Sequence, residues 1–207
     1  MDLDRFIQEF AIQAPPFLFA LTVHELAHGY VANRLGDPTA ARAGRLTLNP
    51  LKHLDILGTI AFFIMHIGWA KPVPVDSRYF KHPERDMLWV ALAGPGANLV
   101  LAVASGLLAK LAMAAAPAIP VFLLYPLLLM LVASAWINVI LAIFNLIPIP
   151  PLDGARVLTG LLPPELAGHY RRLEPFGFII LLILFYTGTI QKLILPLINQ
   201  AHSLLTG

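Results

Sequence analysis

The sequence predicts an all-α polytopic membrane protein, and composition and segment length are the observations that predict it. Hydrophobic residues make up 58% of the 207 positions and charged residues only 13%, with a mean hydropathy of +0.75. Long uncharged runs indicate that lipid, more than a buried soluble core, organises the chain. The formal net charge of +2 is too small to indicate a nucleic-acid partner.

Four apolar segments are each longer than the roughly 20 residues that a spanning helix needs. They cover residues 6–35, 87–116, 121–147 and 176–205. The first is interrupted by Pro15 and Pro16. A fifth apolar stretch, 56–67, is too short for a full span, so it predicts a re-entrant or partly inserted helix. We expect residues 1–207 to form a single membrane-embedded domain.

The distribution of positive charge predicts the orientation of these segments. Of the 14 Lys and Arg residues, eight lie in 34–85 and three in 148–175, whereas 116–120 has none. Positively charged connections stay in the cytosol. We therefore expect 34–85 and 148–175 on the cytosolic side and 116–120 outside, with 56–67 entering from the cytosol.

The motif HELAH lies inside the first apolar segment. His24 and His28 are four residues apart, so they share one helix face, and Glu25 lies beside that face. In this HExxH arrangement two imidazoles bind zinc, and the glutamate takes a proton from a zinc-activated water. An ionisable side chain near mid-bilayer costs about 2.5–3.5 kcal/mol on insertion scales. A cluster of them at this depth therefore indicates a metal site.

A third protein ligand completes most hydrolytic zinc sites, and spacing alone does not choose it. The candidates are Asp153, Glu165, His53, His66, His82, His169 and several acids in 76–86. Asp153 follows an apolar segment that breaks at prolines, and a short helix is predicted over 154–162. Two roles stay open for Asp153. It is either the N-cap of that helix or a ligand at a point where broken backbone lines a cavity.

The stretch GWAKPVPV predicts a small β-strand near the cytosolic side. Pro72 and Pro74 have the same parity, so their missing amides lie on one edge. Lys71, Val73 and Val75 can then pair with an extended substrate on the other edge. An ordinary proline-rich surface loop explains the pattern equally well.

Three further polar residues are candidates for substrate binding or for supporting the metal. Asn98 either satisfies a carbonyl freed by Pro95 or stabilises the active site. Asn145 either hydrogen-bonds a substrate backbone or ties two helices together. His53 is either an additional polar group near the metal or a structural histidine.

Five motifs together carry a resemblance to a known family. They are HELAH, GRLTLNPLKHLD at 44–55, GWAKPVPV, AGPGANL at 93–99 and NLIPIPPLDG at 145–154. In this order they resemble the site-2 protease family of intramembrane zinc metalloproteases, peptidase family M50. The chain lacks the PDZ insertion of many members and so resembles the small, minimal branch.

The resemblance implies that His24, His28 and Asp153 bind one Zn²⁺ per chain and that Glu25 is catalytic. It implies cleavage of membrane protein or peptide substrates within or near their transmembrane segments. The chain is then a multi-pass protein of a bacterial or archaeal cell membrane, with its active site nearer the cytosolic face. Formation of a homo-oligomer stays open. The alternative is a catalytically inactive protein that binds membrane helices and retains the metal site, which the intact Glu25 disfavours.

Overall fold

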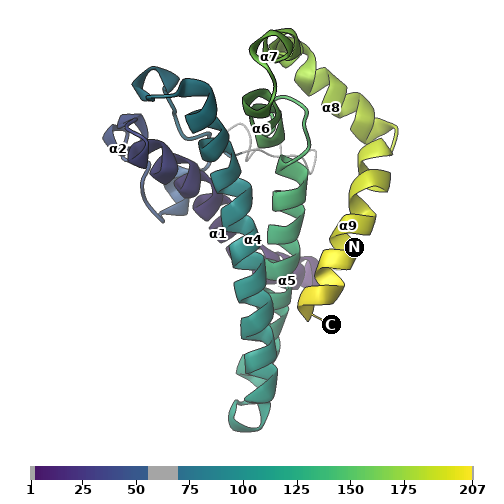
Figure 1. The fold of residues 1–207 in the computed structure, drawn as a ribbon. Coiled ribbons are helices and arrows are strands. Elements are labelled where there is room, and N and C mark those ends of the chain that lie inside the picture. Colours follow the sequence, from purple (N-terminus) through teal and green to yellow (C-terminus); the bar gives the residue numbers. More distant parts are fainter. Residues whose placement is uncertain (1–2, 56–69, 207) are drawn as a thin grey trace.

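The computed structural model describes residues 3–55 and 70–206, which form helices joined by short connections (Figure 1). The α-helices are α1 (Leu3–Arg34), α2 (Thr39–Arg42), α4 (Pro83–Ala114), α5 (Val121–Asn145), α6 (Asp153–Leu161), α7 (Pro164–Arg171), α8 (Gly177–Tyr186) and α9 (Thr189–Thr206). Short 3-10 turns are η1 (Pro50–Lys52), η2 (Ser77–Tyr79), η3 (Ala116–Ala118) and η4 (Glu174–Phe176).

Helices α1, α4 and α5 form the centre of the fold. Among the described residues, these three helices are long and apolar enough to cross a membrane. Figure 1 shows α4 and α5 as a long pair joined by a tight turn at η3, and α1 packs against both. Their outward side chains include Val100 and Phe122, which are 69% and 75% exposed. Lipid is the solvent that suits such a surface, as the composition predicts.

Helix α1 is continuous, although the sequence suggested an interruption at Pro15 and Pro16. Both prolines lie inside the 32-residue helix. Proline fixes φ near the helical value and removes only its own amide hydrogen. Membrane helices tolerate this loss because neighbouring groups satisfy the freed carbonyls. The two histidines of HELAH are therefore held on one long helix.

The fourth apolar segment, 176–205, does not form the expected single spanning helix. It divides into η4, α8 and α9, and Gly188 lies between the two α-helices with φ of 70°. This left-handed conformation ends a helix, and glycine adopts it without the strain that a Cβ brings. In the described ranges 3–55 and 70–206, three helices instead of the expected four are therefore long enough to span a membrane, and a broken pair stands in place of the fourth.

A stripe of isoleucines fixes α9 against the central helices. Ile190, Ile194 and Ile198 are spaced four residues apart and are all buried. They pack with Ala102 of α4 and Val139 of α5. In contrast, α8 contacts α9 and η4, and its apolar side chains are largely exposed.

The small β-strand expected in GWAKPVPV is not found among the described residues. They contain one isolated antiparallel bridge, between Leu54 and Ala70. The amide of Lys71 donates to the carbonyl of His53 at 2.9 Å, and no ladder follows because the next amide on the same edge, that of Val73, donates to Glu25. The short inserted helix expected at 56–67 lies outside the described residues.

We predict that replacing Gly188 with alanine destabilises the protein. A Cβ in the left-handed region costs about 1–2 kcal/mol, which lowers a thermal midpoint by about 2–8 °C for a chain of this size. Thermal unfolding in detergent measures the shift. Gly168→Ala is the matched control, because Gly168 is helical and has open space around it. An unchanged midpoint in Gly188→Ala would mean that α8 and α9 form one continuous helix.

Candidate metal centre

The two histidines of HELAH meet at their Nε2 atoms. They lie one turn apart on α1, and both side chains are buried. The imidazole planes stand at 87° to each other, and the two Nε2 atoms are 3.0 Å apart. A metal ion is the usual partner of two imidazoles arranged in this way.

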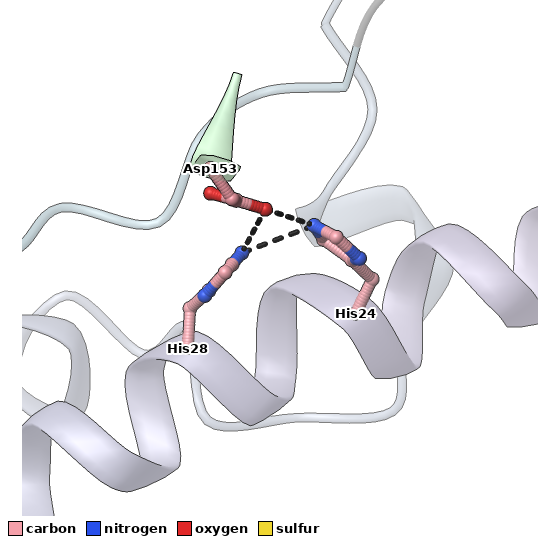
Figure 2. Close-up of side chains that lie close together, drawn as sticks. All are labelled: His24, His28 and Asp153. Atoms are coloured by element: carbon pink, nitrogen blue, oxygen red, sulfur yellow. Dashed lines mark hydrogen bonds and ion pairs between the residues drawn. The ribbon is translucent and has the colours of Figure 1, made fainter. Parts of the chain in front are cut away.

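Asp153 is the third member of this cluster (Figure 2). It is the first residue of α6, and its Oδ2 atom lies 3.1 Å from His24 Nε2 and 3.2 Å from His28 Nε2. The N-cap of α6 is Leu152, which makes no side-chain capping bond. The structure therefore places Asp153 beside the histidines and gives the N-cap position to its neighbour.

The hydrogen bonds of the outer ring nitrogens define the tautomer of each histidine. His24 Nδ1 lies 2.6 Å from Asn98 Oδ1, and His28 Nδ1 lies 2.7 Å from the carbonyl oxygen of Val90. Both partners are acceptors, so each Nδ1 carries the hydrogen and donates it. In a neutral imidazole the Nε2 atom then has a free lone pair. Both lone pairs face the carboxylate of Asp153.

These three atoms fit a zinc ion. With both imidazoles neutral and protonated on Nδ1, two nitrogen lone pairs converge with a carboxylate oxygen, and Asp153 Oδ2 is buried with no hydrogen-bond donor among the described residues. Such an arrangement is repulsive unless a cation lies among the atoms. Ligand atoms around a tetrahedral zinc are about 3.3 Å apart, given metal–ligand distances of about 2.0 Å. The observed separations of 3.0–3.2 Å are close to this value.

Gly94 of α4 lets that helix approach the cluster. A Cβ atom built on Gly94 would lie 2.6 Å from His24 Nε2 and closer still to His28 Nε2. Real Cβ contacts at such distances essentially do not occur, so only glycine fits without moving the imidazoles. The close approach also brings Val90 and Asn98 of α4 within reach of the histidines.

The Glu25 side chain contacts the segment that follows Ala70. Its Oε2 atom accepts a hydrogen bond from the amide of Val73 at 2.8 Å. The Val73 side chain is buried, and Glu25 lies on α1 between His24 and His28. The amide that we expected to pair with a substrate strand is therefore bound to the candidate catalytic carboxylate.

Buried charged residues hold this segment in place. The Arg45 guanidinium donates to the carbonyls of Lys71 and Pro72, at 2.5 and 3.2 Å, and Arg45 is 6% exposed. The Asp37 carboxylate accepts a hydrogen bond from the amide of Asp76 at 2.7 Å. The Arg78 side chain donates to Asp76, and this hydrogen bond lowers the pKa of the Asp76 carboxyl. The position of Val73 beside Glu25 is thus fixed from both sides.

Three of the other candidates make contacts outside the three-residue cluster. His53 is 2% exposed, and its Nε2 atom lies 2.9 Å from the carbonyl of Thr47. Asn145 donates to the carbonyl of Leu141 within α5. Val75 packs against a buried cluster formed with Ala32, Phe80 and Val90. In the described residues, His53 and Asn145 therefore make backbone contacts, and Val75 makes apolar ones.

Arg45, Asp37 and Asn138 are site residues that the sequence reasoning did not identify. Asn138 on α5 accepts a hydrogen bond from Asn98 at 2.7 Å, and both asparagines are fully buried. A buried asparagine in an apolar helix needs a partner, and this is the signal that the sequence offers for Asn138. Arg45 and Asp37 belong to a polar connection, where no periodicity marks a buried charge.

We predict that Gly94→Ala weakens zinc binding, because the added methyl displaces the two imidazoles. Disturbing the support of metal ligands typically costs about 10–100-fold in affinity, and competition with a chromophoric chelator measures the dissociation constant. Gly96→Ala is the matched control, since a Cβ on Gly96 meets nothing within 4 Å. Equal zinc affinity in the two variants would contradict this geometry.

Comparison with known proteins agrees with the resemblance drawn from the motifs. A model of peptidase family M50 matches residues 111–186, which include Asp153. "Putative zinc metalloprotease YwhC" of Bacillus subtilis is 40% identical over 207 residues, covering 97% of this chain and 93% of its own. "Putative zinc metalloprotease Rip2" of Mycolicibacterium smegmatis is 31% identical over 194 residues, covering 90% of this chain and 71% of its own.

The protein of the same name from Mycobacterium tuberculosis is 32% identical over 182 residues, covering 84% of this chain and 66% of its own. No solved structure gives a significant match. The similarity to YwhC extends over nearly the whole of both chains, and the family model covers the segment that carries Asp153. The chain therefore belongs to peptidase family M50.

Proposed function

We propose that the chain is an intramembrane zinc endopeptidase that hydrolyses peptide bonds within or near the transmembrane segments of membrane proteins. One observation carries the proposal. Two histidines of a helix that is long and apolar enough to span a membrane converge with a carboxylate on one point, and Glu25 of the same helix completes the HExxH motif between them. Relatives named as zinc metalloproteases support the reaction type.

His24, His28 and Asp153 would hold the zinc ion. When bound, zinc supplies Lewis acidity that polarises the scissile carbonyl and makes water a nucleophile at neutral pH. Glu25 accepts a proton from that water and passes it to the leaving amine. The Val73 amide holds one carboxylate oxygen of Glu25, which limits the rotamers that the general base adopts. Burial of the histidines keeps bulk water away from the reacting groups.

The position of the site explains why a membrane substrate suits it. His24 and His28 lie inside a helix that is long and apolar enough to span the bilayer. His28 is six residues before Arg34, where α1 ends, so it lies about 9 Å from the end of the helix. A peptide bond at that depth belongs to a transmembrane or membrane-proximal segment. Membrane proteins and the lipid bilayer are therefore the partners that we propose.

The alternative function is a catalytically inactive protein that binds membrane helices and keeps a metal site. The presence of Glu25 in the HExxH motif, with its carboxylate held by the Val73 amide, favours hydrolysis. Capture of membrane proteins by Glu25→Gln, followed by incubation of the captured proteins with the wild-type chain, separates the two. Mass spectrometry should detect cleavage inside or beside their apolar segments. Captured proteins that the wild-type chain leaves uncut would support the alternative.

We predict that Glu25→Gln and Asp153→Ser fail in different ways. Glu25→Gln keeps the ligands and an oxygen acceptor for the Val73 amide, so zinc stays bound while turnover falls by about 10²–10⁴-fold, the usual contribution of a general base. Asp153→Ser removes a ligand, so zinc occupancy and turnover fall together. Plasma emission spectroscopy measures zinc at equal protein. Full zinc with normal turnover in Asp153→Ser would remove Asp153 from the site.

We also propose that the connection around residues 34–85 faces the cytosol, which places the site nearer that side. Residues on either side of 56–69 touch each other, through the bridge from Leu54 to Ala70 and the bonds from Arg45 to Lys71. They therefore lie at the same end of the bundle. The eight Lys and Arg residues of 34–85 are typical of a cytosolic connection.

Cysteine labelling tests this orientation, and the chain contains no native cysteine. We predict that Arg42→Cys and Ser77→Cys react with an impermeant maleimide only from the cytosolic side. Ala118→Cys, in η3 at the other end of α4, should react only from the outside. Labelling of Arg42→Cys and Ser77→Cys from opposite sides would overturn the topology.

A further inference from the structure

A chain of buried hydrogen bonds runs from α5 through α4 to the metal ligand on α1. Asn138 Nδ2 donates to the carbonyl of Ser134 at 2.9 Å. Asn98 Nδ2 donates to Asn138 Oδ1 at 2.7 Å. Asn98 Oδ1 accepts from His24 Nδ1 at 2.6 Å. Asn98 and Asn138 are both fully buried, so water is not available to replace any of these bonds.

The carbonyl of Ser134 determines which group donates in each of these hydrogen bonds. The Ser134 carbonyl only accepts, so the amide nitrogen of Asn138 must face it and the amide oxygen must face Asn98. That oxygen in turn requires the amide nitrogen of Asn98. The Asn98 oxygen is then left for His24, which must donate from Nδ1. The lone pair of His24 is consequently on Nε2, where Asp153 and His28 converge.

The Asn98 amide nitrogen has a second hydrogen-bond acceptor, which does not take over the role of Asn138. The carbonyl of Ala20 also accepts from Asn98 Nδ2, at 3.3 Å. This distance is longer than the 2.7 Å bond to Asn138 and lies beyond the usual range for an N–H···O hydrogen bond. Without Asn138, the Asn98 amide loses its shorter partner and can turn. A turned Asn98 would present its nitrogen to His24 and favour the tautomer whose lone pair is on Nδ1.

We propose that Asn138 is a positioning residue that keeps His24 in the tautomer that binds metal, acting through Asn98. This inference rests on the proposed zinc site, and it concerns a residue that does not touch the metal, the ligands or the substrate. The competing explanation is that Asn138 only joins α4 to α5, as polar residues between membrane helices commonly do. The two explanations differ in whether the loss of Asn138 changes zinc affinity.

The first test replaces Asn138 with leucine, which has a similar volume and no hydrogen-bonding atoms. Competition with a chromophoric chelator, on the full chain in detergent, measures the zinc dissociation constant. We expect it to rise by about tenfold or more, the range typical of groups that orient metal ligands. Asn138→Ala removes the same acceptor without adding bulk and serves if the leucine variant does not fold.

Ser105→Ala is the matched control. Ser105 is buried on α4 and shares a 2.8 Å hydrogen bond with Ser134 of α5. Its replacement removes a cross-helix bond of similar depth but leaves the carbonyl of Ser134 to Asn138. It should lower the thermal midpoint without changing the zinc dissociation constant.

A rescue experiment tests the direction of the hydrogen bonds. In Asn98→Asp the ionised carboxylate has only acceptor oxygens, so His24 must donate from Nδ1 whichever way the carboxylate turns. We expect Asn138→Leu to leave zinc affinity unchanged in this background, although it weakens zinc binding in the wild-type background. A structural tie between helices gives no reason for such rescue.

Two results would overturn the inference: a zinc affinity of Asn138→Leu and Asn138→Ala equal to that of the wild type, or an equal loss in the Asn98→Asp background. A wild-type chain that binds zinc but cuts no membrane protein fails the proposed function and leaves this inference testable. Failure of the proposed zinc site looks different. In that case the wild-type chain itself has no zinc affinity, and the inference falls with it.

Discussion

The structure depends on one electrostatic constraint: three buried atoms with free lone pairs meet at distances of 3.0–3.2 Å. Two neutral imidazoles and a carboxylate repel each other in this geometry unless a cation joins them. The HELAH spacing brings the histidines to one face of α1. The proline-rich break after α5 lets Asp153 begin α6 there, and Gly94 admits α4 closely enough to supply the outer hydrogen bonds.

Different parts of the fold hold the two histidines and Glu25. Helix α4 holds the outer nitrogens of both histidines, whereas the segment after Ala70 holds Glu25. Arg45 and Asp37 fix that segment through backbone groups. Changes in this connection can therefore alter the orientation of Glu25 while the metal ligands stay in place. In the proposed hydrolase, this separation would let the metal site stay rigid while Glu25 exchanges protons.

The sequence predicted the parts of this fold that follow from periodicity and polarity. HELAH inside an apolar segment indicated a metal site, and α1, α4 and α5 lie where three of the four long segments were expected. The break at Gly188 was missed, although a glycine after the apolar run of α8 is an ordinary helix stop signal. The small strand is not found among the described residues, because parity shows which amides are free and not what they bind, and the Val73 amide binds Glu25. Arg45 and Glu25 each bind the segment that follows Ala70, and tertiary packing alone brings them to it.

The central claim is that His24, His28 and Asp153 are the three protein ligands of one zinc ion. X-ray absorption at the zinc edge of the purified, stoichiometrically loaded protein tests it most directly. The account predicts four nitrogen or oxygen neighbours at about 2.0 Å, with outer-shell scattering from two imidazoles. Scattering from one imidazole or from three, or a six-coordinate shell typical of a surface site, would contradict it.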